Sequence, residues 1–270
     1  MASVKQDQAS EMSSFEVRSS DRDHPGLAIA VLVDYDGTIA TNDVTDDLVR
    51  AASSETEWLD LELAYRSGAV GSRALLEAET RLLPPERADL PDLLRHQPHD
   101  PAFVPFIEFA RRHGIAVEIV SDGLGFFVGP AIAALGVGDI PIYSAELRFE
   151  PDGPRISFPN GNPDCAICGT CKRSRVLAHQ AAGRHVVYVG DGYSDQYAVS
   201  YADTVFAKGD LVDICRDRGV AHRGWSTFAD VEEWLRRNLV DGLPAPTAHR
   251  FVCGPEADSA GAPGRQPAPG

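Results

Sequence analysis

The chain has 270 residues, which is enough for one substantial core and an inserted unit. Its formal net charge of −15 argues against a nucleic-acid-binding protein, because that class neutralises phosphates with clustered Lys and Arg. No apolar run reaches the roughly 20 residues that span a membrane, and the first residues lack the layout of a signal peptide. We therefore expect a soluble, cytoplasmic protein that binds neither nucleic acid nor a membrane.

The two ends of the chain have the composition of segments without a core. Residues 1–25 are polar and lead into a Pro-Gly turn, and residues 244–270 are rich in Pro, Gly and Ala. Such segments bury too little apolar surface to offset the entropy of ordering. We expect 1–25 to be a disordered leader and 244–270 a disordered tail.

The first predicted strand covers residues 28–33 and ends at two carboxylates, Asp34 and Asp36. A short, continuous apolar run is typical of a buried strand in a parallel sheet. Open α/β sheets bind ligands beyond the carboxyl ends of such strands. Gly37 allows a tight turn after the carboxylates, and Thr38 adds a hydroxyl. Taken alone, this pattern also describes a solvated turn.

Residues 43–101 have a helical pattern. We predict Thr45 as the N-cap of the first helix and Ser72 as the cap of a later one. The length of the segment favours a separate helical cap, and the alternative is a plain helical connection within one domain.

The next segments alternate between helices and strands. A helix is expected over 105–113, and a strand over 116–120 leads to Ser121. A helix that begins at Gly123 would leave backbone N–H groups free to bind an anion. Taken alone, Ser121 could instead be a simple N-cap.

Later segments complete the predicted sheet. Strands over 143–149 and 155–158 flank a Pro-Asp-Gly-Pro turn and predict a β-hairpin. Two further strands are expected over 185–189 and 204–207, and a last helix over 225–239.

Three of the five cysteines form a Cys-x-x-Cys-x-x-Cys cluster: Cys165, Cys168 and Cys171. In a cytosolic chain this pattern suggests metal or redox chemistry before a disulfide framework. Zinc or an iron–sulfur cluster needs a fourth ligand that the spacing does not supply. Asp164, His179 or a distant cysteine are the candidates, and three reduced thiols are the alternative.

Four stretches together resemble the motifs of the haloacid dehalogenase superfamily of phosphatases. They follow one another in the expected order: Asp34-Tyr35-Asp36-Gly37-Thr38, residues 119–123, Lys172, and residues 189–195. The resemblance covers residues 27–236. It implies an α/β fold with a Rossmann-like core and a parallel sheet.

The resemblance also implies how the chain is divided. Residues 26–42 and 102–243 would form the core, and 43–101 would form a C1-type helical cap like that of the phosphoserine phosphatase group.

The activity implied by the resemblance is Mg²⁺-dependent hydrolysis of a small phosphorylated metabolite. Asp34 would be the nucleophile and Asp36 the general acid and base, with Lys172 as the third catalytic residue. The implied phosphate-binding groups are Thr38, Ser121, Gly123 and Lys172. The implied Mg²⁺ ligands are Asp34, the backbone carbonyl of Asp36, and Asp191, with Asp195 as a further ligand or an anchor.

The substrate is less well defined than the reaction. The cysteine-rich approach to Lys172 is similar to that of the methionine-salvage phosphatases acting on 2-hydroxy-3-keto-5-methylthiopentenyl-1-phosphate. The position of the substrate-reading acid of phosphoserine phosphatases is matched by Asp43 or a neighbour, rather than by Glu.

Several alternatives stay open. They are a phosphoserine or phosphoethanolamine phosphatase, a phosphotransferase of the same fold, and a non-catalytic phosphometabolite sensor or Cys-metal interaction module. A homodimer through the cap or the hairpin is also left open.

Overall fold

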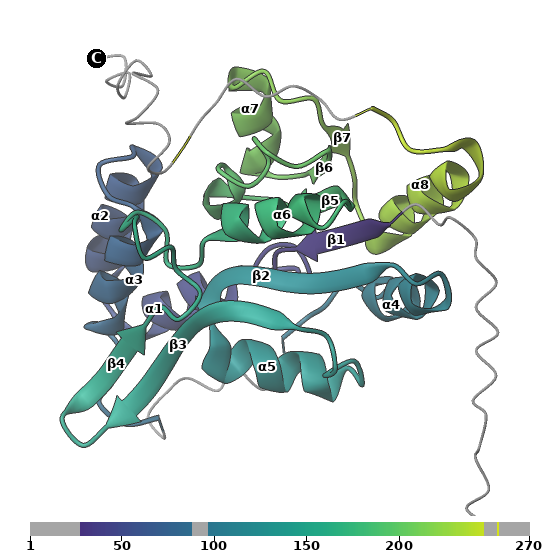
Figure 1. The fold of residues 1–270 in the computed structure, drawn as a ribbon. Helices are drawn as coiled ribbons and strands as arrows, with labels where there is room; N and C mark the ends of the chain where they lie inside the picture. The colour runs from purple at the N-terminus through teal and green to yellow at the C-terminus, as the bar shows by residue number, and fades with distance from the viewer. Residues whose placement is uncertain (1–27, 88–96, 246–252, 254–270) are drawn as a thin grey trace, which may run out of the picture.

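The computed structural model describes residues 28–87, 97–245 and 253 (Figure 1). Its centre is a seven-stranded sheet in the order β4-β3-β2-β1-β5-β6-β7, in which only β4 runs antiparallel to its neighbour. The strands are β1 (Ile29–Val33), β2 (Ala116–Leu124), β3 (Ile142–Glu150), β4 (Gly153–Ser157), β5 (His185–Gly190), β6 (Thr204–Ala207) and β7 (Arg223–Gly224). The predicted α/β class, with its parallel sheet and β3–β4 hairpin, is confirmed.

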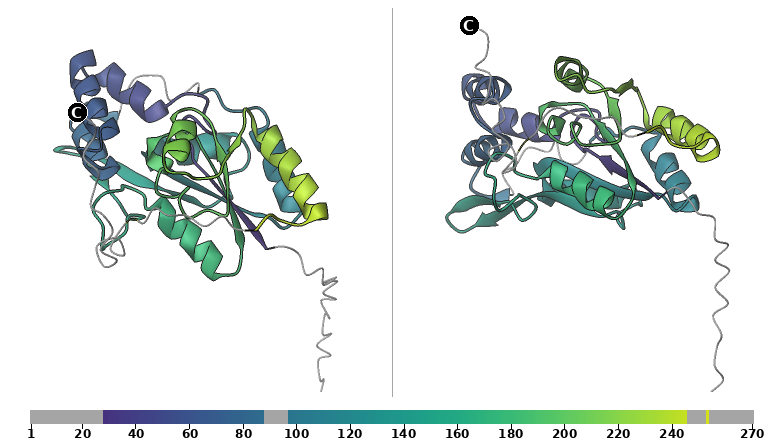
Figure 2. Two further views of the ribbon diagram at one scale, coloured as in Figure 1. Left: turned by 90° about the horizontal axis from the view of Figure 1, so that it is seen from above. Right: turned by 45° about the horizontal axis from the view of Figure 1, so that its top comes forward.

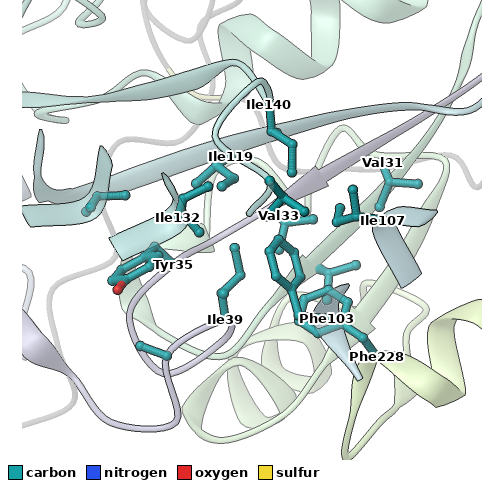
Figure 3. Packing of buried hydrophobic residues seen from close by; sticks show 14 of the residues in the cluster. Val31, Val33, Tyr35, Ile39, Phe103, Ile107, Ile119, Ile132, Ile140 and Phe228 are labelled. Atoms are coloured by element: carbon teal, nitrogen blue, oxygen red, sulfur yellow. The ribbon is translucent and has the colours of Figure 1, made fainter. Parts of the chain in front are cut away.

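Strand β1 lies in the middle of the sheet and is buried along its whole length. Its side chains alternate between two cores, as the pleat of a strand requires. Val31 and Val33 point into one core, where Figure 3 shows them near Phe103 and Ile107. Leu32 points into the core on the opposite face. This explains why the sequence of β1 is continuously apolar.

Helices cover both faces of the sheet (Figure 2). One core contains side chains of α4 (Phe103–Arg112), α5 (Gly125–Ala134) and α8 (Phe228–Asp241). The other contains side chains of α6 (Lys172–Ala181) and α7 (Asp210–Asp217). Layers on both faces place the carboxyl ends of β1, β2 and β5 at one edge, where a ligand can enter.

Three helices between β1 and α4 gather near one end of the sheet (Figure 1). They are α1 (Val44–Ala52), α2 (Glu55–Arg66) and α3 (Ser72–Thr80). We refer to them as the cap helices; the division of the chain at 43 and 101 stays a prediction, and residues 88–96 lie outside the described part.

Two predicted helix caps are wrong. Asp43, not Thr45, is the N-cap of α1, and its carboxylate accepts from the backbone N–H of Asp46 at 2.8 Å. Gly71 is the N-cap of α3, and the Ser72 hydroxyl instead accepts from a backbone N–H outside the helix. Both helices therefore begin within two residues of the predicted position.

Other boundaries also differ from the predictions. β2 continues to Leu124 with a shift of register against β3, so α5 begins at Gly125 rather than at Gly123. α4 begins at Phe103 because Pro105 fits the first turn of a helix, where its missing N–H needs no partner. α8 begins at Phe228, three residues later than predicted.

Some predictions fall on residues without a description. The leader at 1–25 lies outside the described residues, and of the tail at 244–270 only 244, 245 and 253 are described. Among the described helices, none combines the length and apolar character that crossing a membrane requires.

Candidate active site

Asp34 and Asp36 lie on the turn that follows β1. The backbone N–H of Asp34 donates to the carbonyl oxygen of Val189 at 3.0 Å, so the pairing of β1 with β5 extends to the first carboxylate. Gly37 then turns the chain with a φ of +65°, and a Cβ there would lie 2.1 Å from Asp191 Oδ2. Only glycine fits this conformation and this space. The turns after β1 and β5 are therefore in direct contact.

Asp34, Asp191 and Asp195 form the core acidic cluster, in which carboxylate oxygens of all three lie within 4.8 Å of one another. Asp195 is fully buried. Its Oδ2 accepts from the backbone N–H groups of Asp191 and Gly192 at 3.0 and 3.2 Å, and its Oδ1 accepts from the Tyr188 hydroxyl at 2.6 Å. Both oxygens of Asp195 are thus engaged by the protein itself.

Lys172 supplies the cation of this cluster. Its Nζ lies 2.7 Å from Asp34 Oδ2 and 2.7 Å from Asp195 Oδ1, and the side chain is 1% exposed. As the first residue of α6, the lysine is disfavoured by the helix dipole. Burial alone would lower the pKa of Lys172, but Asp195 and Asp34 outweigh burial and raise it. The ammonium therefore stays charged.

Two carboxyl groups of the core acidic cluster, those of Asp34 and Asp191, have raised pKa values. Burial first, and then the charge of Asp195, raises the pKa of Asp34 well above its ordinary range, against the opposing effect of Lys172. The same two causes raise the pKa of Asp191 to about 7. One lysine does not balance three carboxyl groups, of which two are buried and that of Asp191 is half-buried, so the cluster has the donor set and the charge of a cation site.

Thr38 is buried, and its hydroxyl donates to Asp191 Oδ1 at 2.7 Å. We predicted a phosphate contact for Thr38, whereas this hydrogen bond turns its hydroxyl toward Asp191. The bond orients one oxygen of Asp191 and lowers the pKa of that carboxyl in opposition to burial.

Asp36 is held by the start of α1. Its Oδ1 accepts from the backbone N–H of Val44 at 2.8 Å, and its Oδ2 accepts from the Thr45 hydroxyl at 3.1 Å. Burial raises the pKa of Asp36 to about 6, although both hydrogen bonds oppose the shift. A carboxyl group with this pKa can both give and take a proton near neutral pH.

Ser121 and Gly123 lie on the last residues of β2, beside Asp36. The Ser121 side chain is fully buried, and its Oγ accepts from the backbone N–H of Gly123 at 2.8 Å. A Cβ on Gly123 would lie 2.5 Å from Asp36 Oδ2. The anion site predicted at a helix start therefore lies on a strand end, two residues before α5 begins.

A cavity of about 480 Å³ opens in front of these groups. Asp34, Asp36, Ser121, Gly123 and Asp191 line it from the core, and residues of α1, α2 and α3 line the opposite side. Buried Lys172 and Thr38 are not among the lining residues.

Two site residues were not singled out from the sequence. The Ser194 hydroxyl lies 3.3 Å from Asp34 Oδ2 and accepts from Lys172 Nζ at 2.7 Å. The Tyr188 hydroxyl bonds Asp195 from inside a core. The sequence could have identified Ser194, because it lies within residues 189–195 of the fourth motif. It could not have identified Tyr188, which looks like any other residue of a buried strand.

The predicted cysteine cluster does not line the cavity of the acidic residues, although Lys172 and Ser194 border both groups. Cys165, Cys168 and Cys171 line a second, small cavity together with Cys253, and all four are free thiols. Cys253 was the distant cysteine that the spacing did not identify. Among the described residues, the groups whose metal-binding atoms lie within 4.8 Å of one another are both acidic, so the thiols do not form a preassembled site. A bound metal and reduced thiols both stay predictions for these cysteines, and the geometry favours the thiols.

Comparisons with known proteins agree with this geometry. Residues 31–200 match the haloacid dehalogenase-like hydrolase family. The 2-hydroxy-3-keto-5-methylthiopentenyl-1-phosphate phosphatase of Brevibacillus brevis is 29% identical over 213 residues, covering 77% of this chain and 96% of that protein. The protein of the same name from Exiguobacterium sibiricum is 29% identical, covering 79% and 99%.

Solved structures show the same fold. A phosphoserine phosphatase determined as a phospho-aspartyl intermediate analogue matches with a TM-score of 0.60 at 18% identity, over 78% of this chain and 98% of that one. A hydrolase of the same family from Salmonella enterica serovar Typhi matches with a TM-score of 0.61 at 18% identity, over 81% of this chain and 74% of that one.

Proposed function

The chain belongs to the haloacid dehalogenase-like hydrolase family as a phosphatase, and we propose that it hydrolyses a small phosphorylated metabolite through an aspartyl-phosphate on Asp34. The observation that carries this proposal is the contact between the turns after β1 and β5. That contact places Asp34, Asp36 and Asp191 along one wall of a cavity. The remaining steps follow from the chemistry of these groups.

Asp34 would attack phosphorus and displace the alcohol, which is the covalent route open to a carboxylate. Lys172 lies 2.7 Å from Asp34 Oδ2, which keeps this carboxylate in one orientation and offsets the charge that two anions bring together. Ser121 and the Gly123 backbone N–H would donate to the phosphoryl oxygens once their mutual bond opens.

Asp36 would donate its proton to the leaving oxygen, and would then take a proton from the water that cleaves the acyl-phosphate. Its pKa of about 6 and its position on the cavity wall support both transfers.

A divalent cation fits the core acidic cluster, because hard oxygen ligands and excess negative charge are what Mg²⁺ requires. Asp34, the backbone carbonyl of Asp36 and Asp191 would hold it, and Mg²⁺ would neutralise charge on the phosphoryl group. Asp195 would serve as an anchor, because donors from the chain already engage both of its oxygens.

The curated relatives are named for 2-hydroxy-3-keto-5-methylthiopentenyl-1-phosphate, which makes this ester the first candidate substrate. Phosphoserine and other small esters, and transfer to an alcohol acceptor, stay as alternatives. So does a sensor without catalysis.

The test is phosphate release from a panel of phosphorylated metabolites with Mg²⁺, comparing the wild type with Asp34→Asn. We expect turnover that requires Mg²⁺ and falls by at least about a thousandfold in the variant, because the nucleophile is lost. Full activity in Asp34→Asn would exclude the covalent route. A folded, Mg²⁺-binding protein without turnover of any ester would favour the sensor.

A further inference from the structure

A second group of three carboxyl groups lies in the cap. Asp46 of α1, Glu62 of α2 and Glu79 of α3 place oxygens within 4.8 Å of one another, and we call them the cap acidic cluster. All three line the cavity that Asp34 and Asp36 line from the core. Three separate helices thus bring negative charge to one point opposite the proposed nucleophile.

Glu79 shows that this cluster is not satisfied by the protein. The residue is 3% exposed, and neither of its carboxylate oxygens has a hydrogen-bond partner among the described residues. An unpartnered buried carboxylate is costly, because it loses its water shell and gains nothing in return. Its place on the cavity wall means that a bound molecule could supply the missing donor.

The other two members have one partner each. Asp46 accepts from the indole N–H of Trp58 at 3.3 Å, and Glu62 accepts from Arg66 Nε at 3.2 Å. The Arg66 side chain is 53% exposed and also pairs with Asp210 at 2.7 Å. The guanidinium therefore offsets part of the charge of Glu62 and, to a smaller extent, that of Asp46, but it makes no hydrogen bond to Glu79.

The cap acidic cluster lies close to Asp36, the proposed proton donor to the leaving oxygen of the ester. Thr45 donates to Asp36, and Asp46 is the next residue on α1. Asp36 is close enough to contribute to the raised pKa of both Asp46 and Glu79, after burial and the other acids of the cluster. A group bound by the cap acidic cluster would therefore belong to the same small molecule as the ester oxygen that Asp36 protonates.

We propose that the cap acidic cluster binds a primary ammonium group, so that the substrates are phosphate monoesters of amino alcohols. A primary ammonium carries three N–H donors and one positive charge, which match three carboxyl groups of which one, that of Glu62, already pairs with a cation. A divalent cation would need six or more oxygen ligands and would lie beside the Arg66 guanidinium, so it fits less well. This inference rests on the proposed phosphatase activity.

The proposal ranks amine-bearing esters above the compound after which the relatives are named. An enol-ketone ester with a methylthio group, as that name describes, has no cation for Glu79 to bind. The cap acidic cluster therefore favours an amine-bearing ester over that compound.

The first experiment compares matched esters in the presence of Mg²⁺. O-phosphoethanolamine and n-propyl phosphate differ only by an ammonium in place of a methyl group, as do 3-aminopropyl and n-butyl phosphate. We expect kcat/KM to favour the amine of at least one pair by about ten- to a hundredfold, the effect of hydrogen bonds to a charged group. Equal values in both pairs would overturn the proposal and leave the phosphatase function standing.

Glu79→Gln keeps the shape of the side chain and removes its charge. We expect this variant to reduce the amine preference about tenfold. Glu77→Gln is the matched control, since Glu77 lies on the same helix and is exposed. The control should keep the wild-type preference. An unchanged preference in Glu79→Gln would exclude the assignment.

A binding measurement keeps the proposal testable without turnover. In Asp34→Asn, calorimetry should show tighter binding of O-phosphoethanolamine than of n-propyl phosphate, and Glu79→Gln in that background should remove the difference. Equal affinities would overturn the proposal. Titration with Mn²⁺ should give the same stoichiometry with and without Glu79→Gln; the loss of one bound ion would assign the cap acidic cluster to a metal instead.

Discussion

The core acidic cluster and the cap acidic cluster border one cavity, but their oxygens are satisfied in different ways. In the core, Asp195 accepts from Lys172, a tyrosine hydroxyl and two backbone N–H groups. In the cap, Glu79 accepts from none of the described residues. The chain itself determines the geometry of the first cluster, whereas the second depends on a molecule from outside. The core would therefore set the reaction, and the cap would select the molecule that reacts.

The largest effect is expected at Asp36, which lines the cavity that both clusters border. Asp36→Asn removes the proton donor but keeps one oxygen that can accept from the Val44 N–H, while its amide NH2 can donate to the Thr45 hydroxyl. We expect kcat to fall by about 10² to 10⁴, the usual contribution of general acid–base catalysis, with little change in the thermal midpoint. Steady-state kinetics with O-phosphoethanolamine test this. In kcat/KM, which does not include the later cleavage of the acyl-phosphate, phenyl phosphate should lose less, because phenoxide is a far weaker base than an alkoxide and depends less on a proton donor. Equal losses in kcat/KM for both esters would remove the acid role from Asp36.

Lys172→Met tests how much the core depends on its internal cation. Removing the ammonium leaves Asp34 and Asp195 buried and uncompensated. We expect a loss of about 3–5 kcal/mol in the free energy of unfolding, measured in urea. Tyr188→Phe, which removes one hydrogen bond from the same Asp195 oxygen, should cost less. A fully stable Lys172→Met variant would contradict the account of the core acidic cluster.

In the cap, replacing a buried charged residue by methionine should raise the free energy of unfolding, whereas Lys172→Met should lower it. Glu79→Met replaces an unpartnered buried carboxylate with an apolar chain of similar length, and we expect the free energy of unfolding to rise by about 1 kcal/mol. Glu77→Met on the exposed face of α3 should change it little. A loss of stability in Glu79→Met would mean that the carboxylate has a partner.

The difference in the free energy of unfolding between the wild type and Glu79→Met should depend on pH. Burial, and then Asp46 and Glu62, raises the pKa of Glu79 well above its ordinary value of 4.5. The folded state therefore binds this proton more tightly than the unfolded state, so the wild type loses stability relative to Glu79→Met as the pH rises above 4.5. Urea titrations at several pH values measure the difference, which should be smallest at the acidic end.

A smaller effect is expected at the ion pair between Arg66 and Asp210, which links α2 to α7. Both side chains are about half exposed, at 53% and 52%. Solvent screens such pairs, so Asp210→Asn should change the free energy of unfolding by less than about 1 kcal/mol. A larger change would mean that this pair holds the cap in place.

No effect is expected from metal removal at the thiols. Cys165, Cys168, Cys171 and Cys253 do not form a preassembled site, so metal analysis of the purified protein should find less than one zinc or iron per chain. A strong zinc chelator should leave the thermal midpoint unchanged. Stoichiometric metal that Cys253→Ser abolishes would establish a four-cysteine site.

The core acidic cluster could be predicted from the sequence because its residues belong to short, continuous sequence motifs. Asp34 and Asp36 follow an apolar strand directly, and the acids of the fourth motif follow another. Parallel strands end at one edge of a sheet, so these residues meet without any knowledge of packing. Lys172 needed the resemblance, since a lysine at a helix start is otherwise an exposed residue.

The cap acidic cluster could not be predicted in this way. Asp46, Glu62 and Glu79 are separate acids on amphipathic helices, and such acids normally face solvent. Their burial depends on how three helices pack, which no local pattern specifies. The start of α5 and the position of Cys253 in one cavity with the other cysteines depend on tertiary structure for the same reason.

The tight packing at Gly37 limits which parts of the protein can be mutated to alter its substrate specificity. A Cβ there would lie 2.1 Å from Asp191 Oδ2, and one on Gly123 would lie 2.5 Å from Asp36 Oδ2, so neither position can accept a side chain without moving a reacting group. A search for altered specificity gains nothing from varying these turns. The walls formed by α1, α2 and α3 are where new substrates can be accommodated. A mutant library confined to those three helices, with Thr45 kept because its hydroxyl holds Asp36, would vary selectivity while the proposed chemistry stays constant.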